Sequence, residues 1–279
     1  MKIFVCPCKE KEKSMAALPS VTAALIENGL TPVFDESVSE LYRDERAEYM
    51  SGDIIGGCDM LLTVGGDGMM LKWGRKAALA GKPLIGINTG RLGFMTSLDI
   101  DCLDKLSAIA DGSCTFSTRM MLSAELSGKT STALNDIVLF KDVNSKLPEF
   151  TVRINGTTVT KVRADGLIFS TPTGSTAYAL SAGGPIIEPT VECILLTPLC
   201  AHTLLNRPMI FGAGDEVTVS YAAYEGSRVN MSIDGSRGTE FAAENMLVIR
   251  KSPYALRIAE LGEKSFYTTV SEKLMTPLK

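Results

Sequence analysis

Residues 163–185 of the chain read Arg-Ala-Asp-Gly-Leu-Ile-Phe-Ser-Thr-Pro-Thr-Gly-Ser-Thr-Ala-Tyr-Ala-Leu-Ser-Ala-Gly-Gly-Pro. The apolar run 167–169 has the character of a short strand, and every residue from Ser170 to Thr176 is Ser, Thr, Gly or Pro. Such residues supply hydroxyls and backbone amides, and Gly174 permits close backbone approach. The stretch therefore predicts a strand that leads into a loop suited to a polar ligand, with Tyr178 beside it. Composition alone leaves a Ser/Thr-rich surface turn as the alternative.

From Asp165 to Pro185 this stretch resembles the signature of the NAD kinase family, nearly without gaps. In that family the matching residues line the dinucleotide site. The resemblance therefore implies NAD contacts at Asp165, Thr176, Ala177, Tyr178 and Ser181.

The whole chain has 279 residues, of which 45% are hydrophobic, and a formal net charge of −4. It is long enough for one large domain or two ordinary ones with a substantial core. The negative charge argues against a nucleic-acid partner, because such proteins normally carry a basic face. No apolar run is long enough to span a bilayer, and the N-terminus enters a strand-like segment at residues 3–5 without a signal-peptide pattern. We expect a cytoplasmic protein with no membrane partner.

The seven cysteines are scattered along the chain and include no C-x-x-C pair. An odd number in a chain of this size favours reduced thiols over a disulfide framework. Cys6 and Cys8 form one close pair, which lacks the further ligands that a metal needs, so we assign no metal ligands.

Strand and helix patterns alternate over the first hundred residues, which predicts an α/β domain with a parallel sheet. The expected strands are residues 3–5, 31–34, 60–64 and 84–87. The expected helices are residues 14–28, 69–80 and 101–110. The charged segment 37–51 fits either an exposed helix or a mobile loop. We place the nucleotide-binding α/β domain at residues 1–98.

From Thr115 onward the pattern changes to short alternating or β-branched runs separated by turn residues, which predicts an antiparallel, sandwich-like β domain. The expected strands include residues 121–126, 137–140, 150–154, 157–162, 216–221, 229–233 and 246–250. The dipeptides Asn155-Gly156 and Asp234-Gly235 predict two-residue hairpin turns, an explanation that suffices for Asp234. We place the β domain, carrying the NAD site, at residues 99–261. The family resemblance implies that the tail 262–279 returns to the first domain.

Gly65-Gly66-Asp67-Gly68 lies between an expected strand and an expected helix. In that position the glycines let backbone amides approach phosphate oxygens, and the helix dipole favours the anion. We assign Gly65 and Gly66 to phosphate binding and Gly68 to NAD binding. Asp67 is the candidate catalytic residue that faces the acceptor hydroxyl and removes its proton. The alternative is that Asp67 only caps the helix. The resemblance extends over this motif and over the Gly-x-Leu-Gly-Phe segment that ends at Phe94.

Phosphate groups on two substrates call for positive charge near the motifs. The basic residues close to the motifs in sequence are Lys72, Arg75, Arg91, Arg163 and Arg207. We assign Lys72 and Arg91 to phosphate binding and Arg163 to NAD binding. A solvated surface charge is the alternative for each.

Asn135-Asp136 resembles the Asn-Glu pair with which the family holds the adenosine ribose, with a shorter carboxylate in the second position. An amide and a carboxylate can together bind a vicinal diol, although a simple turn before a strand is the alternative. His202 is the chain's one histidine and has no triad partners at recognisable spacing. It lies in a segment that resembles a family segment bordering the site, so we expect it to form part of the wall.

The resemblance implies an NAD kinase, which transfers the terminal phosphate of ATP to the 2′-hydroxyl of the adenosine ribose of NAD. Phosphoryl transfer from ATP calls for Mg²⁺ or another divalent cation on the donor phosphates. The resemblance implies a homodimer or homotetramer. Polyphosphate as the donor stays open. A lipid or sugar kinase with Gly-Gly-Asp-Gly is one alternative, but it leaves residues 165–185 unexplained. A non-catalytic dinucleotide sensor is a second alternative, but such a protein would not need the carboxylate of Asp67 that faces the acceptor hydroxyl.

Overall fold

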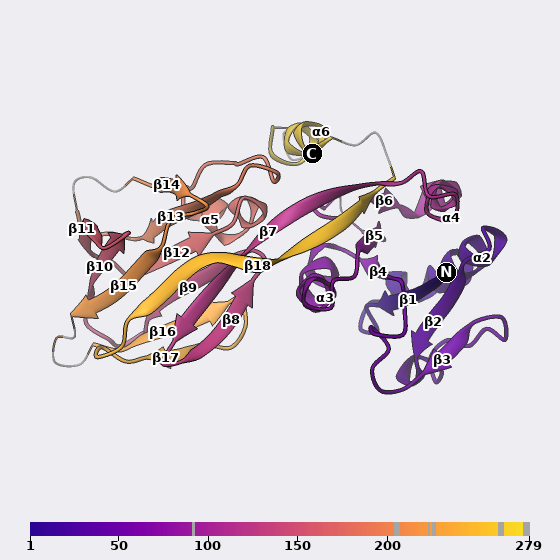
Figure 1. The fold of residues 1–279 in the computed structure, drawn as a ribbon, viewed down its shortest axis with the longest axis horizontal. Coiled ribbons are helices and arrows are strands. Elements are labelled where there is room, and N and C mark those ends of the chain that lie inside the picture. Colours follow the sequence, from indigo (N-terminus) through magenta and orange to yellow (C-terminus); the bar gives the residue numbers. More distant parts are fainter. Residues whose placement is uncertain (91–92, 204–206, 223, 225–226, 262–264, 276–279) are drawn as a thin grey trace. The chain divides into compact units, whose positions relative to one another are not determined.

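The computed structural model describes residues 1–90, 93–203, 207–222, 224, 227–261 and 265–275. Its contacts divide the chain into two compact units (Figure 1). Unit 1 holds Met1–Thr118 and Ala255–Lys279, and unit 2 holds Arg119–Tyr254. The boundary between them falls later in the chain than residue 98.

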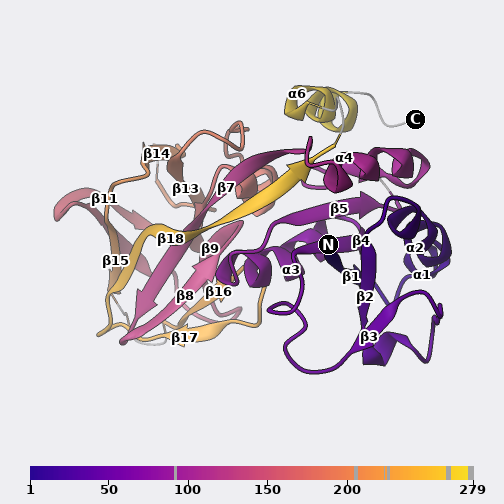
Figure 2. The ribbon, with the colours of Figure 1, turned by 45° about the vertical axis from the view of Figure 1, so that its right-hand side comes forward.

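Unit 1 contains a parallel sheet with the strand order β3-β2-β1-β4-β5 (Figure 2). Its strands are β1 (Lys2–Pro7), β2 (Thr31–Asp35), β3 (Glu48–Met50), β4 (Met60–Gly65), β5 (Leu84–Asn88) and β6 (Leu98–Asp99). Both β6 and the end of β18 (Leu247–Glu260) pair in parallel with β5. The predicted parallel α/β sheet is confirmed, and it brings the ends of β1, β4 and β5 to one edge.

Helices cover both faces of this sheet. The helical segments of unit 1 are α1 (Glu12–Ala16), α2 (Leu18–Glu27), η1 (Glu36–Val38), α3 (Asp67–Leu79), η2 (Ile100–Leu106), α4 (Ser107–Ala110), α6 (Phe266–Val270) and the π-helical η4 (Ser271–Met275). Leu18 and Val21 of α2 pack with Val5 in one buried cluster. On the other face, Trp73 of α3 packs edge-on against Phe4 of β1, with ring centroids 5.2 Å apart. Successive residues of β1 therefore pack against helices on opposite faces of the sheet.

Three expectations for unit 1 were wrong in detail. The helix expected at 14–28 is two helices that meet at Ala17, with Pro19 in the first turn of α2, where a missing N–H costs nothing. The helix expected at 101–110 is mainly the 3₁₀ segment η2, interrupted at Cys102, followed by one turn of α4. The segment 37–51 is neither helix nor simple loop, because it contains the edge strand β3.

Unit 2 contains antiparallel strands in two sheets. Its elements, including the strands that continue into unit 1, are β7 (Thr115–Leu126), β8 (Lys129–Ala133), β9 (Asp136–Lys141), β10 (Glu149–Ile154), β11 (Thr157–Arg163), β12 (Gly166–Ser170), η3 (Thr173–Thr176), α5 (Tyr178–Ser181), β13 (Cys193–Leu199), β14 (Met209–Gly212), β15 (Val217–Ala222), β16 (Val229–Ile233), β17 (Thr239–Phe241) and β18. One sheet has the order β14-β13-β12-β9-β16-β17 and is antiparallel throughout. Strands β11, β10, β15 and β18, with β7 and β8, belong to the 12-stranded sheet that continues from β18 into β5.

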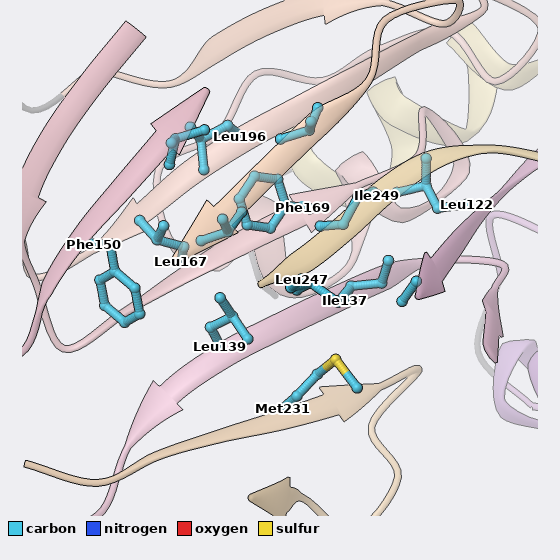
Figure 3. Close-up of a cluster of buried hydrophobic side chains, with 14 of the residues drawn as sticks. Leu122, Ile137, Leu139, Phe150, Leu167, Phe169, Leu196, Met231, Leu247 and Ile249 are labelled. Carbon is cyan, nitrogen blue, oxygen red and sulfur yellow. The ribbon is translucent and has the colours of Figure 1, made fainter. Parts of the chain in front are cut away.

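The core of unit 2 lies between these two layers (Figure 3). Leu167 and Phe169 of β12 point the same way from alternate positions and are fully buried with Ile249 of β18. Burying each such side chain stabilises the fold by about 1.5–3 kcal/mol. The predicted sandwich-like β domain is confirmed, and its alternating pattern fixes which residues of β9 and β12 face the core.

Both predicted hairpin dipeptides adopt positive φ angles. Asn155 and Gly156 have φ values of 50° and 82° and join β10 to β11. Asp234 and Gly235 have φ values of 50° and 70° and follow β16 directly. These are the left-handed conformations that such turns require.

None of the helices within the described part of the chain has both the length and the apolarity to cross a membrane.

Candidate active site

Asp67 is the first residue of α3, and its carboxylate is bound by a second loop. Gly66 occupies the N-cap position and no side chain caps the helix. Instead, the Asp67 Oδ2 accepts a hydrogen bond from the Phe94 N–H at 2.8 Å, and Oδ1 accepts one from Met95 N–H at 3.0 Å. The carboxylate therefore joins the end of β4 to the loop after β5, which argues against the interpretation of Asp67 as a simple helix cap.

The glycines around Asp67 fall into two kinds. A Cβ on Gly93 would lie 2.1 Å from Asp67 Oδ1, so only glycine leaves room for this carboxylate. A Cβ on Gly66 or Gly68 would meet nothing within 4 Å. Gly93 is thus required by the protein's own packing, whereas Gly66 and Gly68 leave open surface beside Asp67. That surface is where a phosphate could approach the helix N-terminus.

Lys273 of η4 lies next to Asp67, although no sequence pattern singled it out. Its Nζ is 3.8 Å from Asp67 Oδ2 and 4.4 Å from the centroid of the Phe94 ring. Phe266 of α6 packs against Phe94 with ring centroids 6.2 Å apart. The C-terminal segment therefore brings a cation to the candidate catalytic carboxylate. Both side chains are about one-third exposed.

The other basic candidates are dispersed. Lys72 and Arg75 are exposed on α3, and Lys72 lines a cavity at the ends of β1 and β2. Arg207 is exposed in unit 2. Arg91 lies outside the described residues.

In unit 2, Asn135 directly precedes β9 and Asp136 is its first residue, and both are held by Asp234. The Asp234 carboxylate accepts backbone hydrogen bonds from Leu134 at 2.8 Å, Asn135 at 2.7 Å and Asp136 at 3.1 Å. Asp234 N–H in turn donates to Asp136 O at 3.0 Å. The hairpin explanation for Asp234 was therefore incomplete, because this side chain fixes the backbone of the Asn-Asp pair. The hairpin dipeptide could not reveal a partner about 100 residues away in the chain.

The Ser/Thr-rich loop of residues 170–176 is joined to the same pair. Thr171 N–H donates to Asn135 O at 2.9 Å, and Thr171 Oγ1 donates to Leu134 O at 2.6 Å. A Cβ on Gly174 would lie 2.1 Å from Asn135 O. The two sequence motifs are therefore parts of one packed arrangement, and Gly174 is needed because the backbone of Asn135 occupies the adjacent space.

Two features of this arrangement indicate an available ligand contact. Asn135 Oδ1 is buried and has no hydrogen-bond partner among the described residues. Asp136 is only 5% exposed. Burial, and to a smaller extent the negative charge of Asp234, raise the pKa of the Asp136 carboxyl to about 7. A buried acceptor without a donor is costly, so a ligand hydroxyl or amine would be a favourable partner here.

Residues 176–181 follow this loop. Thr176 ends η3, and Tyr178 and Ser181 bound the short helix α5, which Ala177 precedes. Buried Ala179 anchors α5 on the outer face of the six-stranded sheet, in a cluster with Val138 and Ile168. The Tyr178 side chain is 49% exposed, so its ring and hydroxyl are available to a ligand.

The remaining candidates lie at the opposite end of β12. Asp165 precedes β12 and is 3.7 Å from Lys141 Nζ, at the end of β9 away from Asp136. The Arg163 guanidinium lies 5.3 Å from the centre of the Tyr224 ring, and Arg163 O accepts a hydrogen bond from His202 N–H at 2.7 Å. Ser170 follows Asp165 by five positions along β12, a span of about 16 Å. The structure thus brings Asn135, Asp136 and the 170–176 loop together, but does not bring Arg163, Asp165 and His202 to them.

Comparisons with known proteins agree with this arrangement of motifs. Residues 8–114 match the ATP-NAD kinase N-terminal domain, and residues 134–261 match the ATP-NAD kinase C-terminal domain. An NAD kinase of Symbiobacterium thermophilum is 40% identical over 229 residues, which cover 80% of this chain and 81% of that protein. An NAD kinase of Caldanaerobacter subterraneus subsp. tengcongensis is 33% identical over 279 residues, 98% of each chain.

Solved structures agree in fold. A yeast NADH kinase complexed with NADH superposes with a TM-score of 0.87 at 23% identity, covering 99% of this chain and 87% of that one. An NAD kinase from Archaeoglobus fulgidus in complex with ATP gives a TM-score of 0.74 at 22% identity, covering 99% of both chains. With both family domains matched and relatives at this level of identity over nearly the whole chain, the protein belongs to the NAD kinase family.

Proposed function

We propose that this NAD kinase transfers the terminal phosphate of ATP to the 2′-hydroxyl of the adenosine ribose of NAD, with Asp67 as the residue that accepts the hydroxyl proton. The observation that carries the proposal is the Asp67 carboxylate, fixed by the Phe94 and Met95 amides beside the open surface of Gly66 and Gly68. An orienting carboxylate is what a hydroxyl acceptor needs.

The step itself needs little covalent chemistry from the protein. The 2′-oxygen forms a bond to the terminal phosphorus of ATP as the bond from that phosphorus to the ADP oxygen breaks. The hydroxyl proton passes to Asp67, and ADP leaves with the electron pair of the broken bond. Because the transition state is loose, catalysis rests on positioning the two substrates and on neutralising phosphate charge. Lys273 at 3.8 Å from Asp67 is the described cation best placed to supply that charge in unit 1.

For NAD binding we propose Asn135 and Asp136 as the ribose contacts, with Thr176, Ala177, Tyr178 and Ser181 completing the dinucleotide contacts of this group. The buried Asn135 Oδ1, which has no hydrogen-bond partner among the described residues, and the neighbouring buried Asp136 carboxyl support this assignment, because a diol or an amine would supply the donor that Asn135 Oδ1 lacks. We retain Asp165, Arg163 and His202 as proposed contacts at the other end of β12.

Mg²⁺ fits this site as a partner of ATP. The described residues contain no group of three or more Asp, Glu, His or Cys side chains that could hold a metal by themselves. Mg²⁺ commonly binds through substrate phosphates and retained waters with one or two carboxylates. We propose that the ion arrives with ATP, where it supplies positive charge to the phosphates. We also propose a cytoplasmic homodimer or homotetramer, an assignment that rests on the family resemblance.

The direct test is to incubate the pure protein with NAD, Mg²⁺ and either ATP or polyphosphate and to measure NADP. NADP formation that depends on the donor supports the proposal, and the two arms identify which donor is used. Binding of NAD with no NADP from either donor would instead favour a dinucleotide sensor. Phosphorylation of diacylglycerol or a sugar in place of NAD would favour the lipid or sugar kinase alternative.

A further inference from the structure

The loop between β5 and β6 carries the two backbone amides that hold the Asp67 carboxylate. One end of this loop is tied to the sheet by Thr89 N–H, which donates to Gly65 O at 3.1 Å. The other end is tied by Ser97 N–H, which donates to Gly86 O at 3.0 Å. The two amides lie between these ties, so their position depends on what holds the middle of the loop.

The middle of the loop rests on the C-terminal segment 265–275. Phe94 is half-buried, and among the described residues the aromatic and cationic partners of its ring both come from this segment. The Phe266 ring of α6 lies tilted at 47° to it, with centroids 6.2 Å apart, a favourable arrangement for an aromatic pair. Lys273 Nζ lies 4.4 Å from the same ring centroid. The segment therefore supports the residue whose N–H binds Asp67 Oδ2.

The order of strands explains why a distant segment reaches this loop. The end of β18 pairs in parallel with β5, with Ile258 opposite Leu84, and the two strands point the same way (Figure 2). Connections that leave parallel neighbours emerge at the same edge of a sheet. The loop after β5 and the segment after β18 are therefore brought together by the sheet, although they lie far apart in the sequence.

The C-terminal segment has anchors of its own. The Ser265 side chain caps α6 by accepting a hydrogen bond from Thr268 N–H at 3.1 Å. Thr269 and Val270, at the end of the same helix, are buried. Phe266 thus projects from a helix that is fixed at both ends, so its ring can support another ring.

We propose that Phe266 is a positioning residue for the phosphoryl transfer, because its ring supports Phe94 and thereby keeps the amides of residues 94–95 on the Asp67 carboxylate. This inference rests on the proposed function and extends the active site to the C-terminal segment. A misplacement of about 1 Å in a catalytic geometry can cost about a hundredfold in rate. A support of this kind can therefore govern turnover without supplying a reacting atom.

Kinetics of Phe266→Ala provide the first test. Its kcat should fall about fivefold or more, while the KM values for NAD and ATP stay within about twofold of wild type. Phe266→Leu, which keeps apolar bulk, should recover most of the loss. Phe116→Ala is the matched control, because Phe116 also packs with a cation of unit 1, the Arg257 guanidinium 4.4 Å from its ring centroid. Wild-type kcat in Phe266→Ala, or an equal loss in the control, would overturn the proposal.

A double substitution separates positioning from general loosening of unit 1. In an Asp67→Asn protein there is no carboxylate to position, so adding Phe266→Ala should change the remaining kcat by less than about twofold. If the second substitution still lowers kcat fivefold, Phe266 acts independently of Asp67 and the proposal is wrong. Thermal melts of each variant show that the compared proteins are folded.

Amide hydrogen exchange tests the support without any turnover. In Phe266→Ala, the amides of residues 94–95 should exchange at least about fivefold faster than in wild type, because the loop opens more often. The amides of Thr89 and Ser97 are internal controls and should keep their wild-type rates. Unchanged rates at residues 94–95, or equal acceleration at all four amides, would overturn the proposal. Failure of the wild-type protein to form NADP would contradict the proposed function, whereas the exchange rates would still decide whether Phe266 supports the loop.

Discussion

Two loops that carry candidate site residues are each held by a carboxylate that accepts backbone hydrogen bonds, but the carboxylates differ in what else they can do. In unit 1, Asp67 binds the Phe94 and Met95 amides and remains about one-third exposed beside open surface. In unit 2, Asp234 binds the amides of residues 134–136, and the residue it positions, Asp136, is the buried one. Asp67 thus holds the backbone of residues 94–95 and is also the proposed proton acceptor. Asp234 only holds the backbone of the residues proposed to bind NAD.

Similar hydrogen bonding to backbone amides therefore does not imply similar function. If this difference holds, substitution of Asp67 should act mainly on turnover, and substitution of Asp234 should act mainly on NAD binding.

Asp67→Asn should lower kcat by about a hundredfold or more, since the amide cannot take the hydroxyl proton. It should also cost about 1–3 kcal/mol of stability, because its NH₂ group would face a backbone N–H. Steady-state kinetics and chemical denaturation measure the two effects. Asp53→Asn is the matched control, because the exposed Asp53 accepts a backbone hydrogen bond from Gly56 at 3.1 Å in the same unit. A similar loss of kcat in the control would remove the special role of Asp67.

Asp136→Asn should make the stability of the protein less dependent on pH. The folded pKa of Asp136 is about 7, raised above its ordinary value of 3.8. The stabilising contribution of the protonated carboxyl is therefore complete below about pH 4 and is lost as the pH rises toward 7. The variant should be more stable than wild type at pH 8 by up to a few kcal/mol, with a smaller difference at pH 5. Parallel stability curves for the two proteins between pH 5 and pH 8 would contradict the burial of an ionised Asp136.

Asp234→Asn should raise the KM for NAD about tenfold, because the backbone of the Asn-Asp pair loses part of its support. Asp215→Asn is its control in unit 2: Asp215 accepts a backbone hydrogen bond from Gly212 at 2.9 Å in an exposed turn. The control should leave the KM for NAD unchanged. An equal rise in both variants would show that general loosening of unit 2, and not the 134–136 backbone, governs NAD binding.

Lys273→Met should reduce kcat about fivefold, because it removes the cation 3.8 Å from the Asp67 carboxylate. Lys273→Arg should recover part of the loss. Lys251→Met, which breaks an exposed ion pair of 2.6 Å with Glu192, is the comparison for a surface lysine. Full activity in Lys273→Met would show that the cation serves only to pack η4 against Phe94.

Arg163→Ala should have the smallest effect, within about threefold on the KM for NAD. Its guanidinium lies over the Tyr224 ring at the end of β12 away from Asn135. Comparing NAD with nicotinamide riboside, which lacks the pyrophosphate, measures whether the residue meets phosphate at all. If the substitution weakens the affinity for NAD more than the affinity for the riboside, Arg163 contacts phosphate. If both affinities fall equally, Arg163 has a structural role.

Much of the fold could be predicted because it depends on patterns among residues that are close in sequence. Apolar runs, glycines after helices and the Asn155-Gly156 turn indicated a parallel sheet followed by an antiparallel domain. The misjudged helices at 14–28 and 101–110 contain a proline and a broken 3₁₀ segment, which hydrophobic spacing does not register. Edge strand β3 is short and only half-buried, so it carries little apolar signal.

The candidate site was less predictable because its contacts join distant parts of the chain. The glycine at 93 was visible in its motif, but its cause, the Asp67 carboxylate occupying the space of a Cβ, needed the structure. Asp234 and Lys273 carried no local pattern that pointed to residues 134–136 or to Asp67. Sequence could therefore name the motifs, but not the groups that hold them in place.

The central claim is that two carboxylates with similar backbone hydrogen bonds have different roles. The most direct measurement is of kcat and the KM for NAD in Asp67→Asn and Asp234→Asn, assayed side by side under saturating ATP and Mg²⁺. The account predicts that Asp67→Asn loses at least a hundredfold in kcat with the KM for NAD nearly unchanged, whereas Asp234→Asn raises this KM about tenfold and keeps most of its kcat. Wild-type kcat in a folded Asp67→Asn protein would contradict this account. A change in the same kinetic parameter in both variants, whether a lower kcat or a higher KM for NAD, would also contradict it.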